Sequence, residues 1–349
     1  MQKKVRCGVI GAGWWGTTVH VPALNDHPKA ELVVVQHQDS KQARKIADSF
    51  NVPYACTTLE EVLAVDPLDA VVISSTPNAH YGQAKAALER GLHVLIEKPM
   101  TFTTAEAMEL VDTAAQNNLH FLLSGPWHYS IHALEARRLV ESGALGQLKM
   151  ISIMMTNTCL VLYRGLPMSG GKRYAEPGLT SYCDPAIAGG GHIYCQVSHA
   201  AAFLAFLTGR EPVEVYARFD NHDCSVDVHN TLNIKLDDGT LVSLASTGAP
   251  TGPRHHEVRA FGTEGMVFLD LFHGKMSYWS ADGESHEYPE LTHETTYPRR
   301  APTENLVDVV LGEAPNGSPA TLGATAVKVI EAACRSAQAN RNVLVSEIL

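Results

Sequence analysis

The sequence predicts an α/β protein. We expect an N-terminal Rossmann domain with a doubly wound parallel sheet, and a C-terminal α+β domain with a large open antiparallel sheet. Strand-like and helix-like segments alternate through the first half of the chain, a glycine-rich turn follows the first strand, and short strand-like runs dominate the second half. The 349 residues exceed one ordinary core, so we expect two domains, residues 1–125 and 126–349.

Apolar and amphipathic runs alternate through the first half. The apolar runs predict strands at residues 5–10, 31–36, 70–74, 93–97 and 120–123. The amphipathic runs predict helices at residues 17–25, 40–49, 59–64, 80–90 and 103–117. This alternation builds a parallel sheet with helices on both faces, and the ligand lies at the carboxyl ends of the strands.

The second half begins with a predicted helix over residues 131–142 and a predicted strand over residues 147–157. Residues 160–190 are rich in glycine, proline and tyrosine without periodicity, which is typical of a functional loop. A helix is expected over residues 192–207, and two more at residues 302–311 and 321–340. Strands are expected at residues 213–218, 229–236, 241–247, 256–262, 266–270 and 275–279.

A glycine-rich sequence, Gly-Ala-Gly-Trp-Trp-Gly, occupies residues 11–16, between the first predicted strand and the first predicted helix. There the glycines let the backbone approach a pyrophosphate, and the free N–H groups at the helix N-terminus bind it. A tight turn alone also uses glycine, but this placement favours a dinucleotide. The tryptophans either cover the cofactor or pack against the long loop. The expected contacts are Gly11, Gly13, Trp14, Trp15 and Gly16.

Composition excludes several classes of protein. Hydrophobic residues make up 45% of the chain and charged residues 18%, and no apolar run is long enough for a membrane helix, so we expect no membrane partner. The formal net charge of −10 argues against a nucleic-acid partner. The N-terminus has no signal-peptide pattern, and the seven cysteines include no C-x-x-C pair. We therefore expect reduced thiols and a cytoplasmic location.

Four motifs in this chain occur together in one known family. They are the glycine-rich turn, Thr-Pro-Asn at residues 76–78, Glu-Lys-Pro at residues 97–99, and Gly-Gly-Gly at residues 189–191 with His199 after it. On these motifs the sequence resembles the glucose-fructose oxidoreductase and inositol dehydrogenase family (Gfo/Idh/MocA), over nearly its whole length. The Glu-Lys-Pro motif is far more specific than the glycine turn.

The resemblance implies an NAD(P)-dependent oxidoreductase. Such an enzyme transfers a hydride between nicotinamide and a hydroxyl-bearing carbon of a sugar, polyol or glycoside. The resemblance also implies a second domain whose open sheet is often used for oligomerisation, so we expect a homodimer or homotetramer. Two alternatives stay open: an NAD-dependent glycoside hydrolase that oxidises and re-reduces its sugar, and a non-catalytic ligand sensor.

Lys98 is predicted to be catalytic on physical grounds as well. It ends a strand of the parallel sheet, where side chains face the ligand crevice, and Pro99 fixes the turn that follows. Its ammonium group can hydrogen-bond the oxygen that becomes a carbonyl and stabilise alkoxide character there. Glu97 is interpreted either as the group that orients Lys98 or the cofactor carboxamide, or as a helix-capping acid.

The resemblance assigns His199 as the second catalytic residue, a base for the hydroxyl proton. Four residues earlier, where the family usually has an aspartate, this chain has Cys195. We interpret a thiol as unable to supply the carboxylate that orients and charge-balances the histidine. Its polar role then passes to Gln196, Tyr194 or Asp184, or the proton path differs.

No metal is expected, although two groups of residues resemble metal ligands. His192, Cys195 and His199 have i, i+3, i+7 spacing and are predicted to share one helix face. They lack a nearby carboxylate ligand and a second cysteine pair, and hydride transfer in the family needs no metal. The second group is interpreted as a solvated connection between strands. It comprises His222, Asp223, Cys224, Asp227 and His229.

The residues at the end of the second strand determine whether the protein prefers NAD or NADP. An acidic residue there would bind the ribose hydroxyls and repel a 2′-phosphate. This chain has His37, with Asp39 two residues later and Lys41 and Arg44 close in sequence. We expect NAD, and NADP stays open. Further cofactor contacts are expected from His37, Ser74, Thr76, Pro77, Asn78, Glu97 and Lys98.

Aromatic and charged side chains are expected to bind a carbohydrate substrate. Aromatic faces suit the apolar side of a sugar ring. The cations of the loop over residues 160–190 either bind an anionic sugar or lie on an ordinary surface loop. The candidates are Lys98, Trp127, His128, Tyr129, Arg164, Lys172, Arg173, Tyr182, Asp184, His192, Cys195, Gln196 and His199, with Arg299 and Arg300 as further cations.

Overall fold

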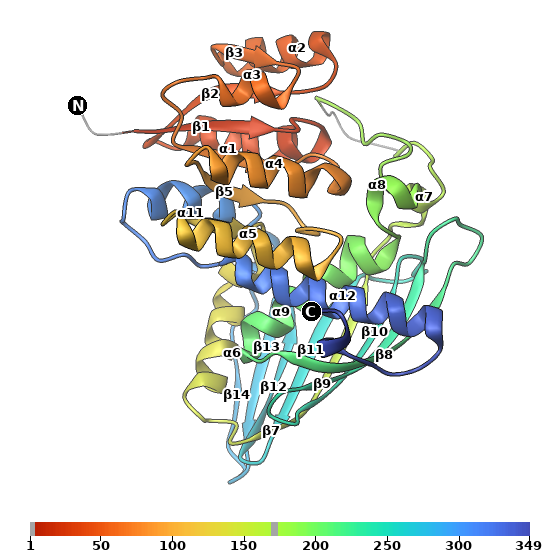
Figure 1. Cartoon of the computed structure of the whole chain (residues 1–349). Coiled ribbons are helices and arrows are strands. Elements are labelled where there is room, and N and C mark those ends of the chain that lie inside the picture. The colour runs from red at the N-terminus through yellow and green to blue at the C-terminus, as the bar shows by residue number, and fades with distance from the viewer. Residues whose placement is uncertain (1–3, 169–173) are drawn as a thin grey trace.

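A computed structural model describes residues 4–168 and 174–349 of the chain. Figure 1 shows two layers, a six-stranded sheet at the top and a nine-stranded sheet at the bottom, with α12 (Ala320–Ala339) between them. This long helix contacts α5 (Thr104–Gln116) of the first layer, and α9 (Ser198–Thr208) and β8 (Pro212–Asp220) of the second. Buried apolar residues of both layers therefore belong to one continuous cluster.

The six-stranded sheet is parallel and has the order β3-β2-β1-β4-β5-β6, which confirms the predicted Rossmann topology. The strand order reverses between β1 and β4. Ligands of open α/β sheets bind in the crevice at that point, outside the carboxyl ends of the strands. The strands are β1 (Val5–Ile10), β2 (Ala30–Gln36), β3 (Tyr54–Cys56), β4 (Ala70–Ile73), β5 (His93–Ile96) and β6 (Phe121–Leu123).

Local sequence signals begin several helices of this layer. Thr103 and Glu106 form a capping box at the start of α5, and the Asp39 carboxylate accepts the backbone N–H groups of Lys41 and Gln42 at the start of α2. The other helices are the π-helix η1 (Gly16–His20), α1 (Val21–Asp26), α2 (Ser40–Phe50), α3 (Leu59–Leu63) and α4 (Pro77–Glu89). α11 (Ala301–Val310) returns from the end of the chain and packs Leu306 and Val307 into the core of this layer.

The nine-stranded sheet has the order β14-β13-β12-β11-β7-β10-β9-β8-β15. The predicted antiparallel pairing is correct except between β7 and β10, which run parallel. A long segment separates these two strands in sequence, as a parallel pair requires. Besides β8, the strands are β7 (Leu148–Thr156), β9 (His229–Leu236), β10 (Leu241–Thr247), β11 (His255–Gly262), β12 (Gly265–Asp270), β13 (Lys275–Ser280), β14 (Ser285–Glu287) and β15 (Val343–Leu344).

Helices cover one face of this sheet (Figure 1). They are α6 (Ile131–Glu141), α9 and α12, and α9 is preceded by the π-helix η3 (Ile193–Val197). The opposite face is exposed, and buried and exposed residues alternate along β9 and β10. Short helices complete the fold: η2 (Pro126–Tyr129), α7 (Leu160–Tyr163), α8 (Pro185–Ala188), α10 (His293–Thr296) and η4 (Val345–Glu347).

The sequence-based element prediction missed strands β3, β14 and β15, each of three residues or fewer. Such short pieces carry no periodicity, and pairing with a neighbouring strand defines them. The predicted helices over residues 17–25 and 192–207 both begin with a π-helical turn. No helix in residues 4–168 and 174–349 combines the length and the hydropathy needed to cross a membrane.

Candidate active site

In the glycine-rich turn, Gly11 and Gly16 lie close to neighbouring atoms, whereas the space beside Gly13 is open. Gly11 has φ +76°, and a Cβ there would lie 2.4 Å from the backbone of Ser75. A Cβ on Gly16 would lie 2.9 Å from the Gly11 oxygen, whereas one on Gly13 would meet no atom within 4 Å. Gln36 Oε1 accepts the Gly11 N–H at 2.9 Å and holds the turn in place. The turn therefore exposes its backbone beside Gly13, where a phosphate can approach.

The turn after β4 forms the neighbouring wall. The buried Ser74 hydroxyl has no hydrogen-bond partner among the described residues, and it lies 3.6 Å from the position of a Cβ on Gly16. Thr76 Oγ1 donates to Asn78 Oδ1 at 2.7 Å, and Pro77 begins α4. These predicted cofactor residues therefore stand directly beside the glycine turn.

Glu97 links the glycine turn to the end of β5. Its Oε1 accepts the indole N–H of Trp15 at 2.9 Å and lies 3.0 Å from His20 Nε2. His20 Nδ1 in turn lies 2.7 Å from the Thr303 hydroxyl of α11. Trp14 packs edge-on against Trp15, with ring centroids 5.8 Å apart. The network fixes Trp15, and the side of the crevice that it forms, against a buried carboxylate.

The Glu97 carboxylate is an anion held in the interior. Its Oε2 accepts the backbone N–H of Lys98 at 3.2 Å. Burial acts to raise the pKa of Glu97, but the hydrogen bond and charge of His20, followed by the charge of Lys98, outweigh it and leave the pKa at about 2. The interpretation of Glu97 as a helix cap is wrong, because Thr103 caps the helix that follows. Its contacts join Trp15 and His20 to the backbone of Lys98.

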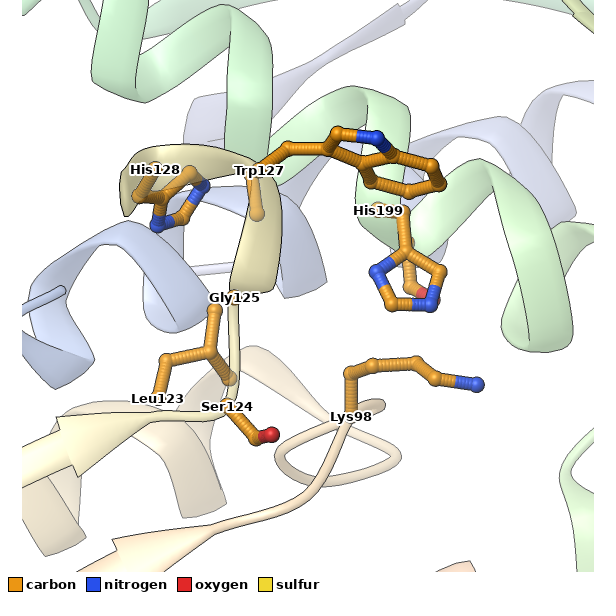
Figure 2. A pocket seen from close by; sticks show the side chains of 9 residues that line it. Lys98, Leu123, Ser124, Gly125, Trp127, His128 and His199 are labelled. Carbon is orange, nitrogen blue, oxygen red and sulfur yellow. The ribbon is translucent and has the colours of Figure 1, made fainter. Parts of the chain in front are cut away.

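Lys98 extends from the end of β5 to the π-helix η3. Its Nζ donates to the backbone carbonyl of Cys195 at 3.0 Å, which is its only hydrogen-bond acceptor within residues 4–168 and 174–349. In Figure 2 the lysine side chain runs beneath the imidazole ring of His199, and Trp127 lies above that ring. The indole of Trp127 meets His199 edge-on, with centroids 5.1 Å apart. The two predicted catalytic side chains are therefore brought together.

A small pocket lies at this meeting point. It is lined by Lys98, Leu123, Ser124, Gly125, Trp127, His128, Ser198, His199 and Ala202 (Figure 2). Burial, followed by the charge of Lys98, holds the pKa of His199 well below its usual value. The imidazole is therefore neutral near pH 7 and can accept a proton.

Asp227 caps the start of the helix that carries His199. It is buried, which corrects the expectation that it lies in a solvated connection between strands. This residue is 7% exposed, and its carboxylate accepts the N–H groups of Gly191 and Ile193, both at 2.7 Å. The amide of Asn230 donates a third hydrogen bond at 2.8 Å. The first two bonds fix the start of the π-helix, and thereby the position of His199. The third bond holds the Asp227 side chain in place. A cap supplied from another strand leaves no signal in the helix's own sequence.

Replacing Asp227 by alanine is expected to lower the free energy of unfolding by about 3 kcal/mol, because it leaves buried N–H groups without acceptors. Urea unfolding followed by circular dichroism measures this change. Asp223→Ala is the matched control. Its carboxylate binds the exposed Arg164, so a change below about 1 kcal/mol is expected. Equal effects of the two substitutions would contradict the capping role.

The Cys195 thiol is more acidic than an ordinary cysteine. A hydrogen bond from the Cys159 thiol lowers its pKa; burial opposes this, and the charge of Lys98 and hydrogen bonds from Gln196 and Tyr163 add to the lowering. Gln196 Nε2 lies 3.5 Å from the Cys195 sulfur. The thiolate is therefore favoured. These partners provide a way for a thiol to carry charge at the position where the family usually has an aspartate.

The prediction that His192, Cys195 and His199 share one helix face is wrong. The fully buried His192 turns to Tyr163, whose hydroxyl lies 2.9 Å from its Nδ1, whereas His199 faces Trp127. The π-helical turn between them widens the helix and breaks the i, i+3, i+7 alignment. Among the described residues, no three His, Cys, Asp or Glu side chains form a group that could hold a metal ion.

Two of the other substrate candidates lie at the pocket or pack near Cys195. Tyr182 packs in the small cluster that contains Cys159 and Cys195, next to the pocket. His128 reaches the pocket, but its buried ring bonds Ser318 and stacks on Phe206.

Three candidates do not face the pocket. Arg164 forms an ion pair with Asp223, Asp184 caps α8, and Tyr129 bonds Asn305. The further cation Arg300 forms ion pairs with Asp26 and Glu304. Lys172 and Arg173 lie outside the described residues.

Several site residues were missed by sequence reasoning. Gln36, His20 and Thr303 hold the glycine turn and Glu97, and Cys159 and Tyr163 surround the Cys195 sulfur. They lie in separate segments of the chain. Only the folded arrangement brings them together, so no local motif could have found them.

Two descriptions of known protein families match separate parts of this chain. Residues 5–124 match the family described as "Oxidoreductase family, NAD-binding Rossmann fold", and residues 133–268 match the "GFO/IDH/MocA C-terminal domain". An uncharacterized oxidoreductase of Synechocystis sp. is 30% identical over 287 residues, which are 76% of this chain and 73% of the relative. The chain belongs to the Gfo/Idh/MocA family. It is therefore an NAD(P)-dependent oxidoreductase.

Two further proteins are similar to this chain, one in sequence and one in structure. A D-xylose 1-dehydrogenase (NADP(+)) of Haloferax volcanii is 29% identical over 268 residues, 74% of each chain. The solved structure of GenD2 from gentamicin A biosynthesis, in complex with NAD, has a TM-score of 0.81 at 23% identity and covers 99% of this chain and 97% of that one. This second likeness shows a shared fold.

The Gfo/Idh/MocA chain described here fits a nicotinamide dinucleotide. The space beside Gly13 is open, and the buried Ser74 hydroxyl, which has no hydrogen-bond partner among the described residues, lies beside Gly16 at the start of the helix after the glycines. Backbone N–H groups of that first turn have no acceptors within the helix and would hold the pyrophosphate.

Proposed function

We propose that this protein is a dehydrogenase of a sugar or polyol, with Lys98 and His199 as its catalytic pair. The observation that carries the proposal is the convergence of a lysine ammonium group and a neutral imidazole at one pocket, at the carboxyl edge of the Rossmann sheet. The existence of a D-xylose dehydrogenase among the relatives supports a carbohydrate substrate.

The nicotinamide ring, when bound, exchanges a hydride with the carbon that carries the reacting hydroxyl. Lys98 keeps one N–H on the Cys195 carbonyl and directs its remaining N–H groups at the substrate oxygen, where they stabilise alkoxide character. His199 accepts the hydroxyl proton, because its ring is neutral near pH 7. Trp127 and the edge contact that it makes position the imidazole. Glu97 orients Lys98 through the backbone N–H.

Cys195 is proposed to act as the anion of this site in place of the usual aspartate. Its sulfur is held by Cys159, Tyr163 and Gln196 close enough to Lys98 for the two charges to interact. A thiolate there balances the lysine ammonium, as a carboxylate would. Tyr194 does not take the polar role of the usual aspartate, because its hydroxyl donates to the Phe102 carbonyl instead.

A substrate screen tests the proposed activity. Purified protein is mixed with NAD or NADP and a panel of neutral sugars, carboxylated sugars, polyols and aryl glycosides, and cofactor absorbance and aglycone release are followed together. A dehydrogenase gives net cofactor reduction. Aglycone release without net reduction would indicate the glycoside hydrolase alternative, and binding without either signal would indicate a sensor. The panel includes anionic sugars because the loop over residues 160–190 is rich in cations.

We infer that NAD is preferred over NADP. The end of β2 presents His37 and then Asp39, whose exposed carboxylate is kept ionised by backbone hydrogen bonds from Gln42 and Lys41 that lower its pKa. An anion here repels a 2′-phosphate.

Asp39→Asn keeps a helix-capping side chain but removes the charge. We expect this variant to raise the ratio of kcat/KM for NADP to that for NAD by about tenfold, equivalent to about 1.4 kcal/mol. Steady-state kinetics with both cofactors measures this ratio. The control Asp48→Asn, on the same helix, should leave the ratio unchanged. No change in the Asp39 variant would contradict the assignment.

We infer that the protein is a homodimer or homotetramer that covers the open face of the nine-stranded sheet. Met150 and Leu241 are register partners on β7 and β10, and with Met154 they are 45%, 58% and 41% exposed. Such an apolar sheet face is most simply covered by a second copy. Light scattering on the eluted protein should give at least twice the monomer mass. A monomer at micromolar concentration would contradict the inference.

Two further expectations remain proposals. We propose a boundary at residue 125 between the cofactor-binding and substrate-binding parts, supported by the separate family matches on either side of it. We propose a cytoplasmic location, which the seven free cysteines support because such thiols persist in a reducing compartment.

A further inference from the structure

Two thiols meet beside the proposed site. Cys159 precedes α7 and Cys195 lies in the π-helix η3, far apart in sequence. They are 4% and 8% exposed, they belong to one small buried cluster with Tyr163, and their side chains hydrogen-bond each other. No bond joins the two sulfurs, and both thiols are free.

The backbone around the two thiols holds them together. The Cys159 N–H donates to the Gly248 carbonyl at 2.9 Å, and the Cys195 N–H donates to the Gly191 carbonyl at 2.9 Å. The two segments are also joined directly, because Asn157 Nδ2 donates to Gln196 Oε1 at 3.2 Å. These bonds keep the segments that carry the two thiols side by side.

The two thiols differ in reactivity. The hydrogen bond from Cys159 and the charge of Lys98 lower the pKa of Cys195, whereas the hydrogen bond to Cys195, followed by burial, raises the pKa of Cys159. A thiolate beside a protonated thiol is the arrangement in which one sulfur attacks an oxidant and the other then displaces the product. By contrast, burial raises the pKa of Cys7, so that thiol is unreactive.

We propose that Cys195 and Cys159 form a reversible redox pair that switches off the active site when hydrogen peroxide oxidises it. The Cys195 thiolate attacks the peroxide oxygen, the O–O bond breaks, and hydroxide leaves, which gives a sulfenic acid. Cys159 loses its proton and attacks that sulfur, the S–O bond breaks, water leaves, and a disulfide forms. Two thiols are oxidised and one peroxide is reduced to two waters.

The disulfide changes the environment of Lys98. It removes the negative charge on the Cys195 sulfur, and it pulls on the residue whose carbonyl holds the lysine Nζ at 3.0 Å. The predicted loss of turnover rests on the proposed function, whereas formation of the disulfide does not.

The test uses the full-length reduced protein treated with hydrogen peroxide. Intact mass should fall by two hydrogen atoms, and peptide mapping without reduction should show a link between Cys159 and Cys195. Dehydrogenase activity on a substrate found in the screen should fall at least tenfold and return with dithiothreitol. Cys183→Ser is the matched control, because this partly exposed thiol lies outside the pair and its variant should respond as the wild type does.

Variants separate the proposal from general oxidative damage. Cys159→Ser and Cys195→Ser should not form the link. Without Cys159, a second equivalent of hydrogen peroxide should oxidise the Cys195 sulfenic acid to sulfinic acid. Dithiothreitol does not reduce a sulfinic acid, so the lost activity should not return in this variant. Absence of the link in the wild type, or a link that leaves turnover unchanged, would overturn the proposal. A link that forms in a protein with no dehydrogenase activity would refute the proposed function and the switching of turnover, while leaving the redox pair itself.

Discussion

Lys98→Ala is expected to lower kcat by about a thousandfold, because removing one donor that stabilises a developing oxyanion has effects of that size. The substitution leaves the glycine turn, Ser74 and the start of α4 in place. The Kd for NAD should therefore change by less than about threefold. Single-turnover kinetics on a substrate found in the screen, together with fluorescence titration of the cofactor, measures both quantities.

Lys85→Ala provides the matched control. Lys85 lies on the surface of α4 and pairs with Glu109, so its loss should leave kcat unchanged. Wild-type turnover in the Lys98 variant would remove this lysine from the reaction. A large loss of NAD affinity would instead indicate that Lys98 chiefly holds the cofactor.

Stability is expected to fall steeply below about pH 6.5, where unfolded histidines take up protons. Three of the buried histidines have a pKa of about 3, and burial is the main reason for it. They are His128, His192 and His256. Between these pH values the unfolded chain binds protons at these positions and the folded chain does not. Stability therefore decreases as the pH falls through this window.

The expected size of this loss follows from linkage. Each histidine contributes about 1.4 kcal/mol per pH unit below its unfolded pKa of about 6.5, so these three together reduce the free energy of unfolding by about 6 kcal/mol between about pH 7.5 and about pH 5. Urea unfolding at the two pH values measures the difference. A loss of this size is a large share of the stability of a typical domain.

His256→Phe supplies the control for this prediction. Neither ring nitrogen of His256 has a hydrogen-bond partner among the described residues, and the ring packs on Trp127 with centroids 4.4 Å apart. A phenyl ring keeps the packing and removes the titration. The loss of stability between the two pH values should therefore become smaller by about 2 kcal/mol, which is the contribution of one histidine. Equal stability of the wild type at the two pH values would contradict the buried neutral histidines.

The fold was largely predictable because its elements carry strong local signals. Apolar β1 followed by the glycine turn, and the threonine caps of α3 and α5, specify the Rossmann layer from sequence alone. The parallel pairing of β7 with β10, the two-residue strand β15 and the return of α11 to the first layer depend on tertiary contacts. Local periodicity contains no information about these features.

The site was predictable only where one motif contained it. Lys98 and Glu97 follow one another at a strand end, so their place was evident, whereas the cap that Asp227 provides comes from a different part of the chain. The lowered pKa of the Cys195 thiol was not predictable for a similar reason. The acidity of a thiol depends on neighbours such as Cys159, which the sequence places far away.

A crystal structure of the protein with NAD and a substrate found in the screen tests the central claim most directly. The account predicts the nicotinamide ring beside the end of β5, the Lys98 ammonium within hydrogen-bond distance of the substrate oxygen, and a nitrogen of His199 facing the same hydroxyl. A substrate bound with Lys98 turned to bulk water, or a cofactor bound away from the glycine turn, would contradict it.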